Sequence, residues 1–286
     1  MTSTTSHPGA RPLTWFLTLL VVFSLPVWLL AIHAGSELPM LSRAVMWCPG
    51  AAALTTCLIC GIDIRSLGWR WPAARFVAAG YWIPWVYAVP VYVATWACIS
   101  GSCAWSDFAS KTAQPYLMSG HQELFAALFG IPTTMLFIVI GTMAWALGEE
   151  LGWRGFLLPR LASRLGITGG GVVSGLIWAA WHYPVLLGAD YNAGTPPIYA
   201  LACFTLMVVG AGIITAWLRM ASGSIWPCVI WHAAHNTLVQ AVLDAMTAKT
   251  GPAPYITTEF GVGMAVLICV VAAVTVAWGR RQHSFG

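Results

Sequence analysis

The chain has 286 residues, of which 59% are hydrophobic and only 8% are charged, and its mean hydropathy is +0.76. This composition excludes an ordinary soluble domain and indicates a protein of the lipid bilayer. The formal net charge of +4 comes mostly from arginines dispersed along the chain, which form no basic stripe, so it does not indicate nucleic-acid binding.

Eight apolar stretches are long enough to cross the bilayer as helices, since roughly 20 residues span a hydrocarbon core of about 30 Å. In chain order they cover residues 12–33, 42–61, 76–98, 125–158, 168–188, 198–218, 223–246 and 260–279. The connections are short, and lipid tolerates only helices or closed barrels. We therefore predict an all-α polytopic membrane protein with about eight transmembrane helices. A single transmembrane domain at 12–281 follows an N-terminal tail at 1–11 and precedes a C-terminal tail at 282–286.

The basic residues predict the orientation of this domain. With eight spans, ten of the thirteen lie on the side of the N-terminus: Arg11, Arg65, Arg70, Arg75, Arg154, Arg160, Arg164, Arg219, Arg280 and Arg281. The other side carries Arg43, Lys111 and Lys249. Because basic residues concentrate on the cytoplasmic side, both termini should be cytoplasmic. Cys98 and Cys103 then begin an outer loop, where we expect a disulfide of modest effect.

Three apolar stretches carry polar side chains, which are costly in hydrocarbon and are retained mainly where they function. The fourth stretch ends in E-E-L-G-W-R, the fifth contains W-A-A-W-H, and the seventh contains W-H-A-A-H-N. The polar residues of these segments are Glu149, Glu150, Arg154, His182, His232, His235 and Asn236.

Their spacing sorts several of these residues onto helical faces. Glu150 and Arg154 are four apart, so they share a face and can pair. Glu149 is rotated by about 100° from Glu150 and can point at a different neighbour. His232 and Asn236 are also four apart and can address one site.

The depth of the glutamates is open between two registers. Residues 124–148 are uncharged and could span the bilayer alone, which would leave Glu149 at the surface. If the helix instead begins after Pro132, it runs on through G-F-L-L-P and places Glu149 near the depth of His232.

Each polar residue also has a plain structural interpretation. His182 alone is more often a packing residue bonded across helices, and Asn236 alone is more often interhelical glue. The glutamates could mark a solvated helix end beside Arg154. Taken together, however, these residues put far more polarity inside the membrane than packing requires.

The three motifs resemble those of the CPBP family, the CAAX-protease and bacteriocin-processing membrane proteins that include the type II CAAX prenyl endopeptidases. The family motif E-E-x-x-x-R is matched by Glu149, Glu150 and Arg154. F-x-x-x-H is matched by His182, with Trp178 in place of the phenylalanine, and H-x-x-x-N is matched by His232 and Asn236. The resemblance covers roughly residues 125–240.

The resemblance implies a membrane endopeptidase, of glutamic or metal-dependent type, whose helices surround an intramembrane catalytic cavity. Glu149, helped by His182, would be the base that activates water, and His232 and Asn236 would be donors to the oxyanion. Glu150 with Arg154 would fix Glu149. His235 matches no motif position, and we interpret it as a packing residue.

A metal is the open alternative within this mechanism. Glu149, His182, His232 and Asn236 could hold a divalent ion such as zinc, and a metal-bound water would be activated. Against it, the spacing is not H-E-x-x-H, and asparagine is an unusual zinc ligand. The residues favour metal-free chemistry slightly, and no cofactor is certain.

The expected partners are the lipid bilayer and a membrane-associated peptide or protein substrate, prenylated or not, and no nucleic acid is expected. The expected location is a bacterial or archaeal cell membrane. Two other functions remain open: a non-catalytic immunity or scaffold protein of the same family, and an ion- or proton-coupled transporter. A transporter would favour inverted repeats, and none is visible in the sequence.

Overall fold

A computed structural model of the chain describes residues 10–35, 39–189 and 191–283. It is 83% helical and has no strand among those residues, so the predicted all-α polytopic class is confirmed. Five long helices follow the predicted stretches closely: α1 (Ala10–Ala34), α2 (Pro39–Cys60), α3 (Ala74–Cys98), α9 (Pro197–Ser222) and α12 (Val262–His283). Four short elements lie between them: η1 (Ile64–Leu67), α4 (Trp105–Ala113), η2 (Gln114–Tyr116) and α11 (Ala253–Ile256).

The fourth and fifth predicted stretches form one helical run of 67 residues, Gln122–Gly188. Its elements are α5 (Gln122–Phe125), η3 (Ala126–Gly130), α6 (Ile131–Thr133), η4 (Thr134–Ile138), α7 (Val139–Glu150), η5 (Leu151–Leu157) and α8 (Leu158–Gly188). The chain reverses within α8 at Gly166, whose φ of 70° is a left-handed value that glycine adopts without penalty. The seventh predicted stretch forms α10 (Trp226–Asn236) followed by the π-helical η6 (Thr237–Leu243).

Among the described residues, six helices are long and apolar enough to cross a membrane. The run Gln122–Gly188 counts once in this total although it turns at Gly166. The multi-pass character of the protein is therefore supported, and the number eight stays a prediction.

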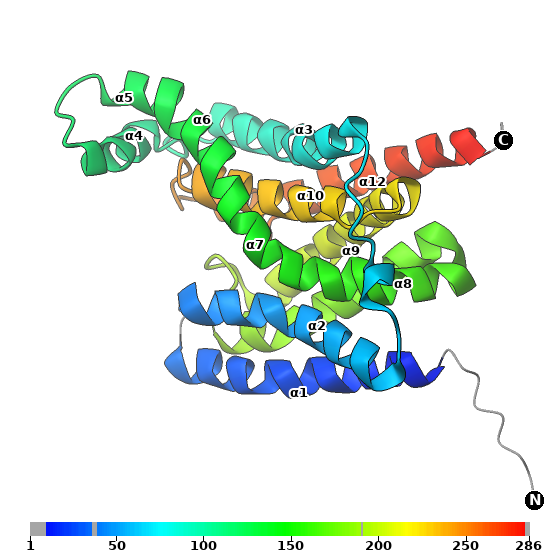
Figure 1. The fold of residues 1–286 in the computed structure, drawn as a ribbon. Coiled ribbons are helices and arrows are strands. Elements are labelled where there is room, and N and C mark those ends of the chain that lie inside the picture. Colours follow the sequence, from blue (N-terminus) through cyan, green and yellow to red (C-terminus); the bar gives the residue numbers. More distant parts are fainter. Residues whose placement is uncertain (1–9, 36–38, 190, 284–286) are drawn as a thin grey trace, which may run out of the picture.

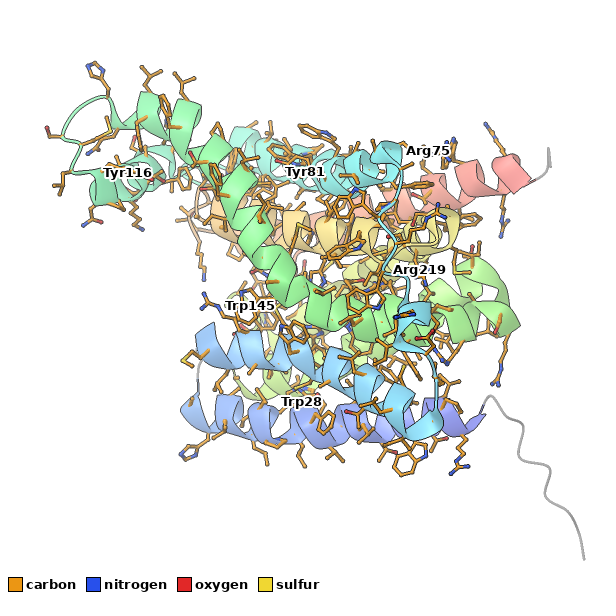
Figure 2. The ribbon with its side chains drawn as sticks, in the orientation of Figure 1. Trp28, Arg75, Tyr81, Tyr116, Trp145 and Arg219 are labelled. Atoms are coloured by element: carbon orange, nitrogen blue, oxygen red, sulfur yellow. The ribbon has the colours of Figure 1, made fainter. Side chains whose placement is uncertain are left out.

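Figure 1 shows α7 passing obliquely between the α1–α2 pair and the group formed by α3, α10 and α12. The start of α1 and the end of α12 lie on one side of the bundle, which we call the terminal end (Figure 1). The end of α1 and the segments that follow α3 and η6 lie on the opposite side, which we call the loop end, together with residues 191–196 after α8 (Figure 1). Arg75 lies toward the terminal end, and Tyr116 lies at the loop end (Figure 2).

Glycines bring α2 and α7 together next to the two glutamates. A Cβ added at Gly50 would lie 2.6 Å from the backbone oxygen of Gly148, and one added at Gly152 would lie 2.5 Å from Pro49 Cβ. These distances are too short for any side chain. The small-residue contacts set α2 directly against the segment that carries Glu149 and Glu150.

Two sequence-based expectations fail at this level. Arg154, which the sequence places among the cytoplasmic charges, is 1% exposed and lies inside the bundle, because it pairs with a buried carboxylate. Cys98 and Cys103 are exposed free thiols, so the expected disulfide is not formed. The tail predictions fall largely on residues 1–9 and 284–286, outside the described residues.

Candidate active site

Glu149 and Glu150, at the end of α7, lie at the same level of the bundle as His232 of α10. Glu149 is 2% exposed and Glu150 is fully buried, and Glu150 Oε1 lies 2.9 Å from His232 Nδ1. The helical run begins at Gln122, as in the first predicted register, but it continues without a break through residues 155–159, as in the second. A surface position for Glu149 is therefore wrong.

Glu150 holds a buried cluster of charged and polar groups. Arg154 Nη1 donates to Glu150 Oε1 over 2.9 Å, so the predicted pairing of these two residues is confirmed. His232 shares the same oxygen through Nδ1. Because an ionised carboxylate only accepts, Nδ1 of His232 carries a hydrogen and donates it to Glu150.

Glu149 is held by two tryptophans instead of a cation. Its Oε2 accepts one hydrogen bond from Trp153 Nε1 at 3.0 Å and another from Trp178 Nε1 at 2.6 Å. Its Oε1 accepts none from the described residues. The two indoles therefore fix one oxygen of the carboxylate and leave the other for a ligand.

Trp178 is the hub of the site. Its ring centroid lies 5.4 Å from that of His232 and 6.3 Å from that of His182, and Arg154 Cζ lies 4.3 Å over the ring. From sequence, Trp178 counted only as an aromatic ring in place of phenylalanine. The signal that was missed is the indole N–H, since phenylalanine could not donate to Glu149.

His182 has a defined tautomer. Its Nδ1 lies 3.1 Å from the backbone oxygen of Trp178, and a carbonyl can only accept, so Nδ1 carries the hydrogen. In the neutral ring, Nε2 then has a free lone pair. The ring is held by edge contacts with Trp181 at 4.7 Å and with Phe204 at 5.1 Å.

One cavity of about 140 Å³ collects four of the six predicted site residues: Glu149, His182, His232 and Asn236. Glu150 and Arg154 are not part of its lining and lie behind it. The side chain of Asn236 is half-buried and makes no hydrogen bond to the described residues. On another side, α1 and α2 contribute an apolar wall made of Val27, Ala31, Leu41, Val45 and Met46.

A second acid–imidazole pair, which the sequence did not reveal, lines the same cavity. His235 Nε2 lies 3.0 Å from Glu259 Oε1, and Tyr87 Oη lies 2.6 Å from His235 Nδ1. Treating His235 as a packing residue was therefore incomplete. Glu259 also accepts from Tyr191 at 2.7 Å and from Gln240 at 3.3 Å.

Glu259 lies outside the membrane-spanning segments, in the turn before α12. Burial alone would raise its pKa, but hydrogen bonds from His235, Tyr191 and Gln240 outweigh this effect and lower the pKa to about 2. Glu259 carries no motif in the sequence, and its partners come from α10, η6 and the segment after α8. Tertiary contact alone assembles this group.

The described residues do not assemble a metal centre. Among them, no three His, Cys, Asp or Glu side chains gather closely enough to hold an ion. The described residues therefore do not gather Glu149, His182 and His232 closely enough for the alternative zinc set, and the mechanism proposed for this site uses no metal.

Comparisons with known proteins place a family model over this same region. The model described as type II CAAX prenyl endopeptidase Rce1-like matches residues 131–238, which contain all three motifs. A protein of Methanococcus maripaludis named CAAX prenyl protease 2 is 27% identical to this chain over 144 residues. That alignment covers 48% of this chain and 53% of the relative, so the chain matches about half the length of that protein. The resemblance of the motif-bearing helices to the type II CAAX prenyl endopeptidases is thereby confirmed.

Proposed function

We propose that this protein is an intramembrane endopeptidase that hydrolyses a peptide bond of a membrane-associated peptide or protein. One observation carries the proposal: Glu149, His182, His232 and Asn236, from three different helices, line a single cavity. Peptide hydrolysis needs a base for water, donors for the oxyanion and a site shielded from bulk solvent. This cavity holds candidates for each.

Glu149 is the proposed base. Its Oε1 takes a proton from a water molecule, and the oxygen of that water attacks the carbonyl carbon of the substrate. His182 Nε2, an acceptor in the assigned tautomer, orients the same water. When the C–N bond breaks, Glu149 returns the proton to the leaving amine, so the carboxylate is regenerated.

His232 and Asn236 are the proposed oxyanion donors, from Nε2 and the side-chain amide respectively. Because Nδ1 of His232 already donates to Glu150, a donor role for Nε2 requires the doubly protonated ring. The ionised forms of Glu149 and Glu150 then balance Arg154 and protonated His232. Charge balance of this kind is what makes four buried ionic groups tolerable.

The substrate class is the finer part of the proposal. The apolar wall from α1 and α2 suits a hydrophobic group on the peptide, which is consistent with a prenylated CAAX-type substrate. The test is hydrolysis by the purified protein in proteoliposomes of matched peptides with and without a C-terminal prenyl cysteine. Cleavage by wild type but not by Glu149→Gln supports the proposal, and equal cleavage by both contradicts it. Activity that survives metal chelation is the expected result for the metal-free mechanism.

Topology is tested separately. We propose cytoplasmic termini, which place the terminal end of the bundle in the cytoplasm. Reporter fusions after Arg75 and Arg281 should both report cytoplasm, and an outer-side signal from either contradicts this orientation.

The alternative is a non-catalytic scaffold protein. It would not explain why the Asn236 side chain and Glu149 Oε1 line the cavity without a hydrogen bond to the described residues. Substrate binding without cleavage by the wild-type protein would favour it.

A further inference from the structure

A hydrolase inside a bilayer must be supplied with water. Each turnover of the proposed reaction consumes one water molecule, and the cavity faces an apolar wall on the side of α1 and α2. Hydrocarbon does not deliver water efficiently to such a site. A polar route from one end of the bundle is therefore a requirement of the proposed function, on which this inference rests.

A polar stripe runs along one face of α10 and η6 and leads out of the site. His232, Asn236, Gln240 and Asp244 are each four residues apart, so they follow one side of the helix. Exposure increases along the first three, since His232 is buried, Asn236 is half-buried and Gln240 is exposed. The stripe thus extends the third motif by two turns toward the loop end.

The stripe connects two cavities. A second cavity, of about 410 Å³, lies at the loop end, and its lining includes Asp244, Lys249 and Asn192. Three side chains line both cavities: Tyr191, Gln240 and Glu259. The active-site cavity and the loop-end cavity therefore meet at these residues.

The junction is polar and charged. Tyr191 Oη donates to Glu259 Oε2, and Gln240 Nε2 donates to Glu259 Oε1. An ionised carboxylate surrounded by donors is a strong site for water, because water can both donate to its oxygens and pass hydrogen bonds onward. Apolar side chains at these three positions would offer water no hydrogen bonds and would hinder its movement between the two cavities.

We propose that the stripe of Asn236, Gln240 and Asp244, together with Glu259, is the path by which water reaches Glu149 from the loop end of the bundle. Water enters through the loop-end cavity and passes Gln240 and Glu259. It reaches the catalytic cavity beside Asn236.

The test attaches a bulky group to the proposed path and then removes it again. Gln240→Cys in proteoliposomes is treated with a bulky, charged, membrane-impermeant methanethiosulfonate, and labelling at each cysteine is read by peptide mass spectrometry. The native thiols calibrate the reaction, because Cys98 and Cys103 are exposed whereas Cys57 and Cys228 are fully buried. The thiol introduced by Gln240→Cys should label at a rate comparable to that of Cys103. A rate as low as that of Cys228 would overturn the path.

Activity gives the second readout. Labelling of Gln240→Cys with the bulky reagent should lower kcat at least tenfold, and removal of the adduct with a reductant should restore it. The small adduct left by methyl methanethiosulfonate should have a weaker effect. Wild type treated with the same bulky reagent is the matched control, since it carries adducts on its own exposed thiols only. An unchanged kcat in fully labelled Gln240→Cys would overturn the proposal.

A third measurement separates blocked water from blocked substrate. In the Glu149→Gln background, the labelled and unlabelled forms of Gln240→Cys should bind a fluorescent prenylated peptide with the same Kd. Loss of binding on labelling would make the stripe a substrate groove and overturn the water path. If wild type cleaves no peptide at all, the proposed function fails, while the labelling rate still reports whether the passage is open.

Discussion

Two acid–imidazole pairs flank one cavity, and they differ in what completes each of them. In the first pair, Glu150 binds His232 through Nδ1 and also binds Arg154, so Nε2 of His232 remains for the cavity. In the second pair, His235 uses both ring nitrogens, Nε2 for Glu259 and Nδ1 for Tyr87. A histidine that lines a cavity can therefore act on a substrate only if one of its ring nitrogens has no hydrogen-bond partner within the protein.

The sharpest test of this comparison sets Glu149, beside the first pair, against Glu259 of the second. Glu149→Gln keeps shape and burial but removes the proton acceptor, so kcat should fall by about 10²–10⁴-fold, as is typical for loss of a general base. Glu259→Gln should lose less. The measurement is peptide hydrolysis by both variants, each shown to be folded by its elution as a single species. A larger loss for Glu259→Gln would reverse the two roles.

The next largest effect is on stability at the first pair. Glu150→Gln leaves the guanidinium of Arg154 buried without its anion, which should cost about 3–5 kcal/mol. The double variant Glu150→Gln/Arg154→Met should recover part of the melting temperature without recovering activity. Thermal melts in detergent check both statements. If the double variant melts no higher than the single one, the ion pair is not the cause.

The second pair, Glu259 with His235, should make the stability of the protein depend on pH. The pKa of Glu259 is lowered from 4.5 to about 2. Its contribution to stability is therefore present above about pH 4.5 and is lost as the pH falls toward 2. At roughly 1.4 kcal/mol per pKa unit, the contribution is about 3 kcal/mol. Between pH 5 and pH 3, wild type should lose more melting temperature than Glu259→Gln, and parallel curves would contradict the assignment.

The smallest predicted effect concerns the indole that holds Glu149. Trp178→Phe keeps the ring beside both histidines but removes the hydrogen bond to Glu149 Oε2. A hydrogen bond to a charged group is worth about 1.5–3 kcal/mol, so kcat should fall by roughly 10- to 100-fold, with KM little changed. Trp181→Phe is the matched control, because Trp181 lies on the same helix as Trp178 and the change removes an indole hydrogen bond to Ser24 of α1. Equal losses in both variants would indicate a packing effect.

The motif residues show how far the sequence could be interpreted. The spacing of Glu150 and Arg154 predicted their ion pair correctly, since residues four apart on a helix are always neighbours. The same reasoning did not find the contact of His232 Nδ1 with Glu150, because the two residues are 82 positions apart. It also undervalued Trp178, whose indole N–H matters only when Glu149 is within reach.

Glu259 marks the limit of such interpretation. No spacing ties it to His235 or to Tyr191, which lies 68 residues away. Its neighbours meet only because the turn before α12 packs against α10 and the segment after α8. A lone glutamate between two apolar stretches gives no sign of this.

By itself, the sequence determined that the chain is helical and crosses the membrane, and that three of its apolar stretches carry polar side chains. Hydrophobic length and the 3.6-residue period are local properties, and they survive without knowledge of the fold. The tertiary structure alone decided the depth of Glu149, the burial of Arg154, the tautomers of the histidines and the junction at Glu259. These depend on which helices touch and on where each polar atom finds its partner, and a bilayer penalises every polar atom that finds none.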